Sequence, residues 1–281
     1  MSSLRDIRQR LRSVENIKKI TDAMERVAVA RLRRAQAKAE ESRPYVNKMK
    51  KILENLATTG RSHPLFEKRT VKKTALIVIS ADRGLSGPYN NNLLQATHHF
   101  LKKYSSDQIE LILFGRKAVD HFRYKEWVIA EQLTDWGGKI TFDRIKEMTD
   151  LMVDSFLAKK YDEVWIIYTH YKTVMHREVI TEKFLSIGKP HSETPAQRIN
   201  YIFEPDAFAI YSTILERYCI SILQKAINES YASELAARIV AMQTANKNSE
   251  KMIESLTITR NKVRQEGITR EIIEVASGAQ Y

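Results

Sequence analysis

The chain has 281 residues, of which 43% are hydrophobic and 28% charged, values that exclude a wholly disordered protein. No apolar run reaches the roughly 18–20 residues of a membrane-spanning helix, and the single cysteine, Cys219, excludes a disulfide framework and a cysteine-rich zinc site. The net charge of +12 lies mostly in residues 1–51, where 15 basic and 6 acidic side chains predict an acidic partner. The absence of an apolar signal stretch at the N-terminus predicts a cytosolic location.

Residues 1–57 predict one long helix. Residues 1–43 contain neither glycine nor proline, and the alanine-rich stretch 31–39 favours helix. We expect a bend close to Pro44. Apolar side chains recur in steps of three and four residues, which predicts a coiled-coil seam made of Leu4, Ile7, Leu11, Val14, Ile17, Ile20, Met24 and Val27.

Residues 70–205 alternate between apolar and amphipathic segments. The apolar segments predict strands at 74–80, 109–114 and 162–169, and the amphipathic ones predict helices at 91–103, from 116 onward, and at 141–159. This order predicts a small α/β domain with a parallel sheet and helices on its faces. Residues 170–187 predict a polar hairpin, and residues 199–203 predict a last strand.

Residues 206–281 predict a second long helix. Neither glycine nor proline occurs in 206–266, and a helix over about 207–276 would be roughly 105 Å long. Such a helix needs a partner, and the N-terminal helix is the nearest one, in antiparallel orientation. The predicted seam contains polar residues, which suggests that another protein surrounds the pair; its members are Leu235, Ile239, Met242, Asn246, Ser249, Ile253, Leu256, Arg260 and Val263.

No motif predicts a catalytic centre. Asp82-Arg-Gly-Leu-Ser-Gly87 follows the first predicted strand, where an α/β domain would hold phosphate, but its spacing fits neither the dinucleotide fingerprint nor the P-loop. A tight turn with two glycines is favoured instead. Ser86 lacks the nucleophile-elbow spacing, and the seven histidines lack metal-ligand spacing. We therefore predict no catalytic residue, no metal and no cofactor.

Two alternatives to a purely structural protein remain open. One is a nucleotide-binding α/β enzyme. The other is a coiled-coil scaffold or nucleic-acid-binding protein that uses the basic N-terminal helix. Residues 1–44 contain no aromatic side chain, so stacking on bases is unsupported.

Three blocks of the sequence resemble the gamma subunits of F-type ATP synthases. The first runs from Ile7-Arg-Gln-Arg-Leu-Arg-Ser-Val14 to Leu32-Arg-Arg-Ala-Gln36, the second is Asp82–Gly87, and the third runs from Ala232-Ser-Glu-Leu-Ala-Ala-Arg238 to Gly278-Ala279. The resemblance covers essentially the whole chain. It implies a long antiparallel coiled coil of the N- and C-terminal helices (1–57 and 206–281) and a small Rossmann-like α/β domain between them (70–205).

The resemblance implies a rotor without catalytic residues. The shaft would stand inside a ring of three alpha and three beta subunits, and the middle domain would lie next to epsilon and the ring of c subunits. Proton or sodium flow would turn the c ring, and the shaft would couple that rotation to ATP synthesis or hydrolysis. The expected location is a peripheral membrane complex at the cytoplasmic face of a bacterial inner membrane, or at the matrix face in mitochondria if the chain is processed. No nucleic-acid binding and no direct membrane insertion are expected.

The resemblance also assigns partner-binding residues. Met24, with Lys18 and Lys19 beside it, would face an acidic loop of the beta subunits. Near the C-terminus, the expected contacts of the beta subunits are Arg264, Gln265, Thr269 and Glu271. The expected contacts of the c ring and epsilon are Tyr201, Phe203 and Glu204.

Overall fold

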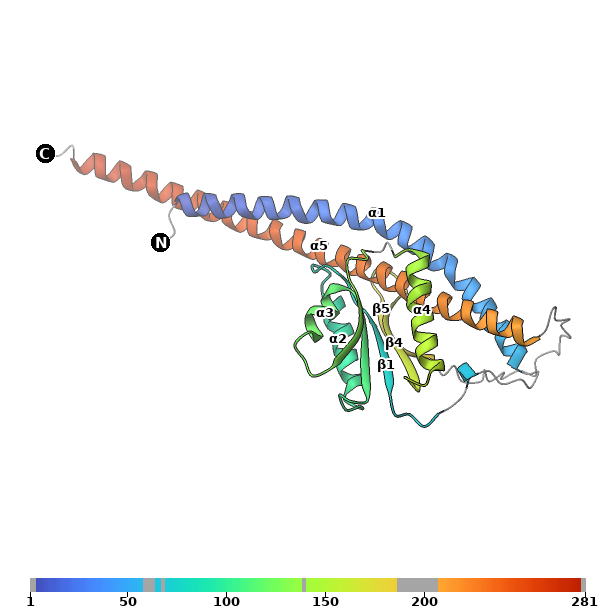
Figure 1. The fold of residues 1–281 in the computed structure, drawn as a ribbon. Helices are drawn as coiled ribbons and strands as arrows, with labels where there is room; N and C mark the ends of the chain where they lie inside the picture. The colour runs from blue at the N-terminus through green and yellow to red at the C-terminus, as the bar shows by residue number, and fades with distance from the viewer. Residues whose placement is uncertain (1–3, 58–63, 67–68, 138–139, 186–206, 279–281) are drawn as a thin grey trace. The chain divides into compact units, whose positions relative to one another are not determined.

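The computed structural model describes residues 4–57, 64–66, 69–137, 140–185 and 207–278 (Figure 1). Two long helices, α1 (Leu4–Ala57) and α5 (Ala207–Gly278), bracket in sequence a middle part that holds all the described strands, which confirms the predicted α/β class. Contacts within the chain define two units. Met1–Ala30 with Arg238–Tyr281 form one, here called the two-helix unit; Arg31–Ala237 form the other, here called the sheet unit.

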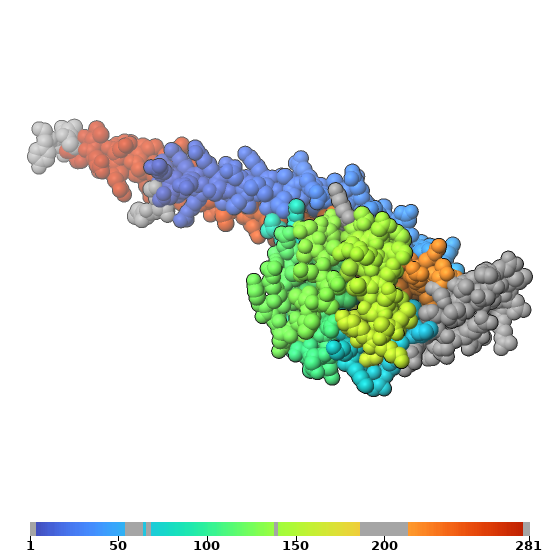
Figure 2. Space-filling model, viewed as in Figure 1, coloured from blue at the N-terminus to red at the C-terminus, as the bar shows by residue number. Residues whose placement is uncertain are grey.

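In the two-helix unit, α1 and α5 run antiparallel, as predicted. Thr21 lies against Asn246, and the Lys18 ammonium lies 2.9 Å from a carboxylate oxygen of Glu250, so residue numbers rise along one helix as they fall along the other. The C-terminal end of α5 extends past the N-terminal end of α1 (Figure 2). Side chains 264–277 of α5 are all exposed, so within the described chain this end is uncovered.

The seam predicted on α5 is correct. Its first five members, from Leu235 to Ser249, are buried, and the next four, Ile253, Leu256, Arg260 and Val263, are half-buried. The polar residues Asn246 and Ser249 are thus interior positions, only 8% and 7% exposed.

The seam predicted on α1 is wrong after Val14. Ile17, Ile20 and Val27 are 51%, 59% and 50% exposed, and the buried residues are Thr21 and Ala28. The physical reason is geometric. A two-helix seam repeats every seven residues, and Thr21 and Ala28 continue the heptad position of Ile7 and Val14. A prediction based only on apolar side chains departs from this seven-residue period after Val14.

The sheet unit contains a five-stranded sheet with the order β3-β2-β1-β4-β5. The strands are β1 (Thr74–Ile79), β2 (Ile109–Phe114), β3 (Val128–Leu133), β4 (Glu163–Tyr171) and β5 (Arg177–Leu185). All neighbouring pairs are parallel except β4 and β5. Every residue of β1 is buried, as expected for a central strand with both faces covered.

Alternation along the strands separates two layers of side chains. Leu76 and Val78 of β1 pack with α2 (Tyr89–Leu101) and α3 (Arg116–Phe122). Ala75, Ile77 and Ile79 face the opposite layer, where α4 (Phe142–Leu157), a single 3₁₀ turn (Pro64–Phe66) and the parts of α1 and α5 within the sheet unit contribute the core. The sheet is therefore a wall between two hydrophobic layers.

Three expectations about the middle need correction or limitation. β3 was not predicted; none of its residues is fully buried, so its pattern is weak. The hairpin predicted within 170–187 contains one strand, β5. This strand pairs with β4, most of which lies before residue 170. The strand expected at 199–203 lies outside the described residues.

Pro44 lies inside α1, which is assigned as one helix from residue 4 to residue 57. Within the described residues, none of the helices combines the length and the apolar character that crossing a lipid bilayer requires.

Candidate partner-binding surface

The outward side of α1 in the two-helix unit carries a second apolar stripe. Ile17, Ile20, Met24 and Val27 follow one another in steps of three and four residues; Met24 is half-buried and the three others are about half exposed or more. We call these four residues the outer stripe. Exposed isoleucine and valine at helical spacing on a helix that already has a buried seam are typical of an interaction surface.

The seam beneath the outer stripe is polar where a stable coiled coil would be apolar. The Thr21 hydroxyl bonds the Asn246 side-chain oxygen, and the Asn246 amide donates to Asp22 at 2.8 Å and to Glu25 at 3.0 Å. Gln243 also donates to Glu25, at 3.0 Å. Polar seam residues fix the register of two helices at a cost in stability.

Lys18 and Lys19 differ in surroundings. The hydrogen bond to Glu250 raises the pKa of Lys18, whose ammonium pairs with α5 at the surface of the two-helix unit. Lys19 is exposed, and its side chain makes no hydrogen bond or ion pair within the described chain. Of the two lysines assigned from the resemblance, Lys19 is the better placed to meet a partner.

The uncovered end of α5 carries the second predicted group. Arg264, Gln265, Thr269 and Glu271 are all exposed. Apolar residues share this end: Ile268, Ile272, Ile273 and Val275 are 49%, 62%, 61% and 73% exposed. The predicted foot residues Tyr201, Phe203 and Glu204 lie outside the described residues.

Asp82 ties the loop after β1 to the start of α3 and to the segment after β3. The Asp82 carboxylate accepts the backbone N–H groups of Arg116, Asp135 and Gly137 at 2.8–3.1 Å. The next two N–H groups of α3 are also bonded, Lys117 to the Ala81 carbonyl and Ala118 to the Ser80 hydroxyl. The donors that would bind an anion at this helix N-terminus are therefore occupied.

The turn itself differs from the expectation of two obligatory glycines. Gly87 has a positive φ of 55°, but the other left-handed residue is Leu85, with φ 62°, and not Gly84. Ser86 is buried and accepts a hydrogen bond from Asn90, so its side chain is a packing group.

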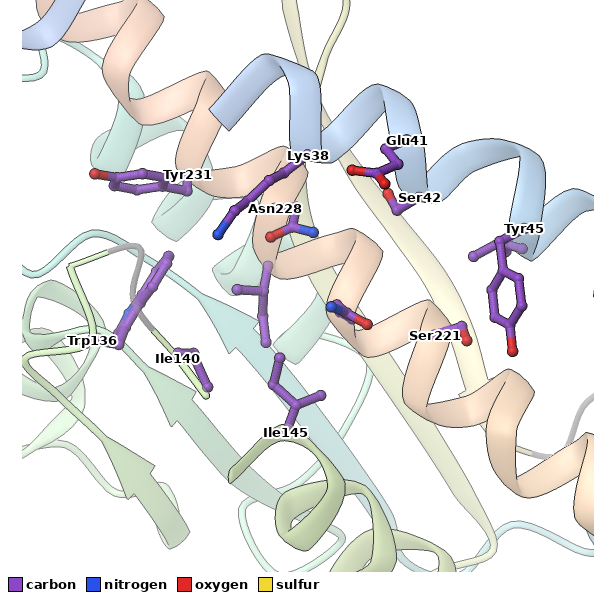
Figure 3. Close-up of a pocket in the computed structure, with 13 residues that line it drawn as sticks. Lys38, Glu41, Ser42, Tyr45, Trp136, Ile140, Ile145, Ser221, Asn228 and Tyr231 are labelled. Atoms are coloured by element: carbon purple, nitrogen blue, oxygen red, sulfur yellow. The ribbon is translucent and has the colours of Figure 1, made fainter. Parts of the chain in front are cut away.

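A cavity of about 380 Å³ lies within the sheet unit between α1, α5 and α4 (Figure 3). The polar residues of its lining include Lys38, Glu41, Gln224 and Asn228. Trp136 also lines the cavity, and its indole N–H has no hydrogen-bond partner among the described residues. No hydrogen bond among the described residues pairs these groups as an acid and a base. Among the described residues, no cluster of three or more histidine, cysteine or carboxylate side chains is arranged to hold a metal ion.

Sequence reasoning missed a buried ion pair in the sheet unit. The Glu229 carboxylate is fully buried and receives two hydrogen bonds from the Arg43 guanidinium, at 2.8 and 3.2 Å, and one from the Tyr171 N–H at 3.0 Å. Arg43 also donates to the Tyr171 carbonyl at 2.9 Å. The pair joins α1, α5 and β4. A charged residue in a helical stretch gives no sign from sequence alone that it is interior.

Comparisons with known proteins agree with this architecture. The family model described as ATP synthase matches residues 3–280. The chain is 47% identical to the ATP synthase gamma chain of Protochlamydia amoebophila, over all of this chain and 99% of that one. It is 37% identical to the gamma chain of Pelotomaculum thermopropionicum, over 99% of both chains.

Solved structures show the same fold. A chain of the Euglena gracilis mitochondrial ATP synthase, in a structure of OSCP, F1 and c-ring, has a TM-score of 0.68 at 17% identity, covering 99% of this chain and 93% of that one. A chain of the Tetrahymena thermophila central stalk and c-ring has a TM-score of 0.62 at 22% identity, covering 80% and 99%. Because the sequence relatives match over their whole length, the chain belongs to the ATP synthase gamma chain family.

Proposed function

We propose that this chain is the central rotor shaft of an F-type ATP synthase and couples ion-driven rotation of a c ring to ATP synthesis or hydrolysis. The observation that carries the proposal is the two-helix unit: an antiparallel pair with a polar seam, an apolar outer stripe and an uncovered end of α5. A pair of this kind gains stability from partners around it. Membership of the gamma chain family supports the other subunits of the synthase as those partners.

The partners are three alpha and three beta subunits around the two-helix unit, with epsilon and the c ring at the foot. Met24, Lys18 and Lys19 contact beta subunits, and so do Arg264, Gln265, Thr269 and Glu271 near the end of α5. Tyr201, Phe203 and Glu204 contact the c ring and epsilon. The exposure of Lys19 and of all four α5 residues supports this assignment.

The chain contributes mechanical coupling, and catalysis belongs to other subunits. The spacing of Asp82–Gly87 supports this part, because it fits neither the dinucleotide fingerprint nor the P-loop. The complex is peripheral on the membrane, at the cytoplasmic face of a bacterial inner membrane, and the driving ion is a proton or sodium. Residues 1–57, 70–205 and 206–281 serve as shaft helix, foot domain and shaft helix.

Met24→Lys tests the proposal in the assembled enzyme. Met24 is half-buried on the outer stripe, so the added ammonium stays solvated in the free chain but lies at the surface that meets an acidic loop. We expect ATP-driven ion pumping in inverted membrane vesicles to fall severalfold relative to ATP hydrolysis. Asn248→Lys is the matched control: Asn248 is exposed on α5, away from the buried seam and from the outer stripe of α1, and the same charge there should leave the pumping ratio unchanged. Equal effects of the two variants would contradict the assignment.

Purification of the full chain from its own cells distinguishes the proposal from its rivals. The shaft should be recovered in a large assembly with ATPase activity. Recovery with nucleic acid and without ATPase activity would favour the coiled-coil scaffold, and tight binding of ATP or NAD to the isolated chain would favour the enzyme.

A further inference from the structure

Three nitrogen atoms meet on the α2–α3 side of the sheet unit. His98 Nε2 on α2 lies 2.7 Å from His121 Nε2 on α3. The Lys125 Nζ lies 2.6 Å from His121 Nε2 and 3.1 Å from His98 Nε2. Phe122 packs beside both imidazoles and fixes their position. Neither the proposed rotor function nor the sheet core explains why these groups converge.

No arrangement of protons satisfies all three contacts. If the Lys125 ammonium donates to both imidazoles, their two lone pairs face each other at 2.7 Å. If His98 instead donates to His121, its N–H points toward a second donor, the ammonium at 3.1 Å. The hydrogen-bond geometry is therefore that of two acceptors around one cation.

The contacts with Lys125 require an acceptor nitrogen on each imidazole, because an ammonium has donors and no lone pair. An imidazole that accepts in this way is neutral and can bind a transition metal, whereas an anion such as phosphate would need the protonated form. The cluster thus favours a cation over an anion.

The distance between the two Nε2 atoms selects a coordination geometry. With metal–nitrogen bonds of about 2.0 Å, two ligands at a right angle lie about 2.8 Å apart, and two tetrahedral ligands lie about 3.3 Å apart. The observed 2.7 Å matches the right angle. Tetragonal nitrogen coordination is typical of Cu²⁺ and Ni²⁺.

The site is reachable from solvent on the side of His98 and Lys125. An open cleft of about 860 Å³ is lined by His98, Lys125 and Glu126, among others. Water in this cleft can supply the ligands that the protein does not. Lys125 is exposed, so its side chain can swing away without disturbing the core.

We propose that His98 and His121 are the two protein ligands of a tetragonal Cu²⁺ or Ni²⁺ site that clamps α2 to α3, and that the Lys125 ammonium occupies the metal position when the metal is absent. The proposal concerns the sheet unit alone and is independent of the rotor function.

Titration of the full chain with CuCl₂ and with NiCl₂ tests the site, by calorimetry and by visible absorption. We expect one saturable equivalent, with a copper resonance spectrum that shows two coupled imidazole nitrogens. His98→Ala and His121→Ala should each weaken binding at least about tenfold, since loss of even an outer partner typically costs that much. His99→Ala is the matched control, because His99 is exposed on the same helix and is not part of the cluster; it should leave affinity unchanged.

Lys125→Met decides the role of the amine. Removing a competing ammonium should raise metal affinity, and the metal should raise the melting temperature of this variant more than that of the wild type. The proposal is overturned if Lys125→Met weakens binding, if His99→Ala weakens binding as much as His98→Ala, or if no saturable equivalent is found. Helical circular dichroism of each variant shows that a loss of binding is not a loss of fold.

Discussion

Removal of the Arg43 guanidinium should destabilise the sheet unit through the carboxylate it leaves behind. Glu229 is fully buried, and in Arg43→Met it would keep one hydrogen bond from protein, that of the Tyr171 N–H. His170 Nδ1 lies 3.2 Å from Glu229 but lacks hydrogen-bond geometry, so it is a weak substitute. Methionine retains the aliphatic stem of arginine, so the variant removes charge more than packing.

The magnitude follows from the burial of the two partners. Breaking a buried ion pair from one side costs about 3–5 kcal/mol, because an uncompensated charge stays in the interior. Arg43 is still 35% exposed at its side chain, so water reaches the vacated position and the lower end, about 3 kcal/mol, is the expected loss. With a denaturant slope of about 2–3 kcal/mol per molar in urea, the midpoint should fall by about 1 M.

Urea unfolding of the full chain, followed by circular dichroism and tryptophan fluorescence, measures this loss. The double variant Arg43→Met/Glu229→Gln should recover a large part of it, because a neutral amide retains the acceptor for the Tyr171 N–H without a buried charge. Arg144→Met is the control: its partner is Glu147 on an exposed face of α4, and such pairs contribute within about 1 kcal/mol. A loss in Arg43→Met no larger than in Arg144→Met, or no recovery in the double variant, would refute the reasoning.

Two further predictions concern the sheet unit. Gly115→Ala should destabilise the fold by about 3 kcal/mol or more in urea unfolding, because at φ +91° the added Cβ would lie 2.2 Å from the carbonyl oxygen of Ser80. Gly137→Ala is the control: its φ is +45° and the space around it is open, so it should cost only about 1–2 kcal/mol. Similar losses in the two variants would contradict the steric argument. Protonation of His98 and His121 should lower the stability of the fold in acid. The pKa values of both imidazoles in the folded chain lie below the ordinary 6.5, so the unfolded chain binds protons first. Stability is therefore lost as the pH falls from about 6.5 through the folded pKa values. Melting temperatures between pH 8 and pH 5 measure this loss, and an unchanged acid dependence in the double glutamine variant of the two histidines would count against it.

The outer stripe shows how sequence and tertiary structure divide the information. The helical period of residues 1–57 determines that α1 forms and that it is apolar on one side of most turns. It does not determine which residues are interior, because Ile17 and Thr21 lie one turn apart and only the partner helix selects between them. By hydrophobicity alone, Ile17 would be the interior residue. The heptad geometry of two packed helices selected the threonine, with Asn246 opposite it.

The same division holds in the middle of the chain. Strong apolar runs determined β1, β2 and β4, since strands covered on both faces need continuous apolar sequence. The edge strand β3 has no such run and is defined by its pairing with β2. Asp82 gave no sign in the sequence that its carboxylate would receive three N–H groups from residues 34 to 55 positions away.

The sequence by itself determined the two long helices, their antiparallel pairing, the strands β1, β2 and β4 and the family, because these follow from local period, breaker residues and motif order along the chain. Only the tertiary structure decided which apolar residues face outward, that Arg43 neutralises a buried Glu229, and that His98 meets His121. The physical reason is that burial and electrostatic contact depend on distances between residues far apart in sequence, and no local pattern encodes such distances.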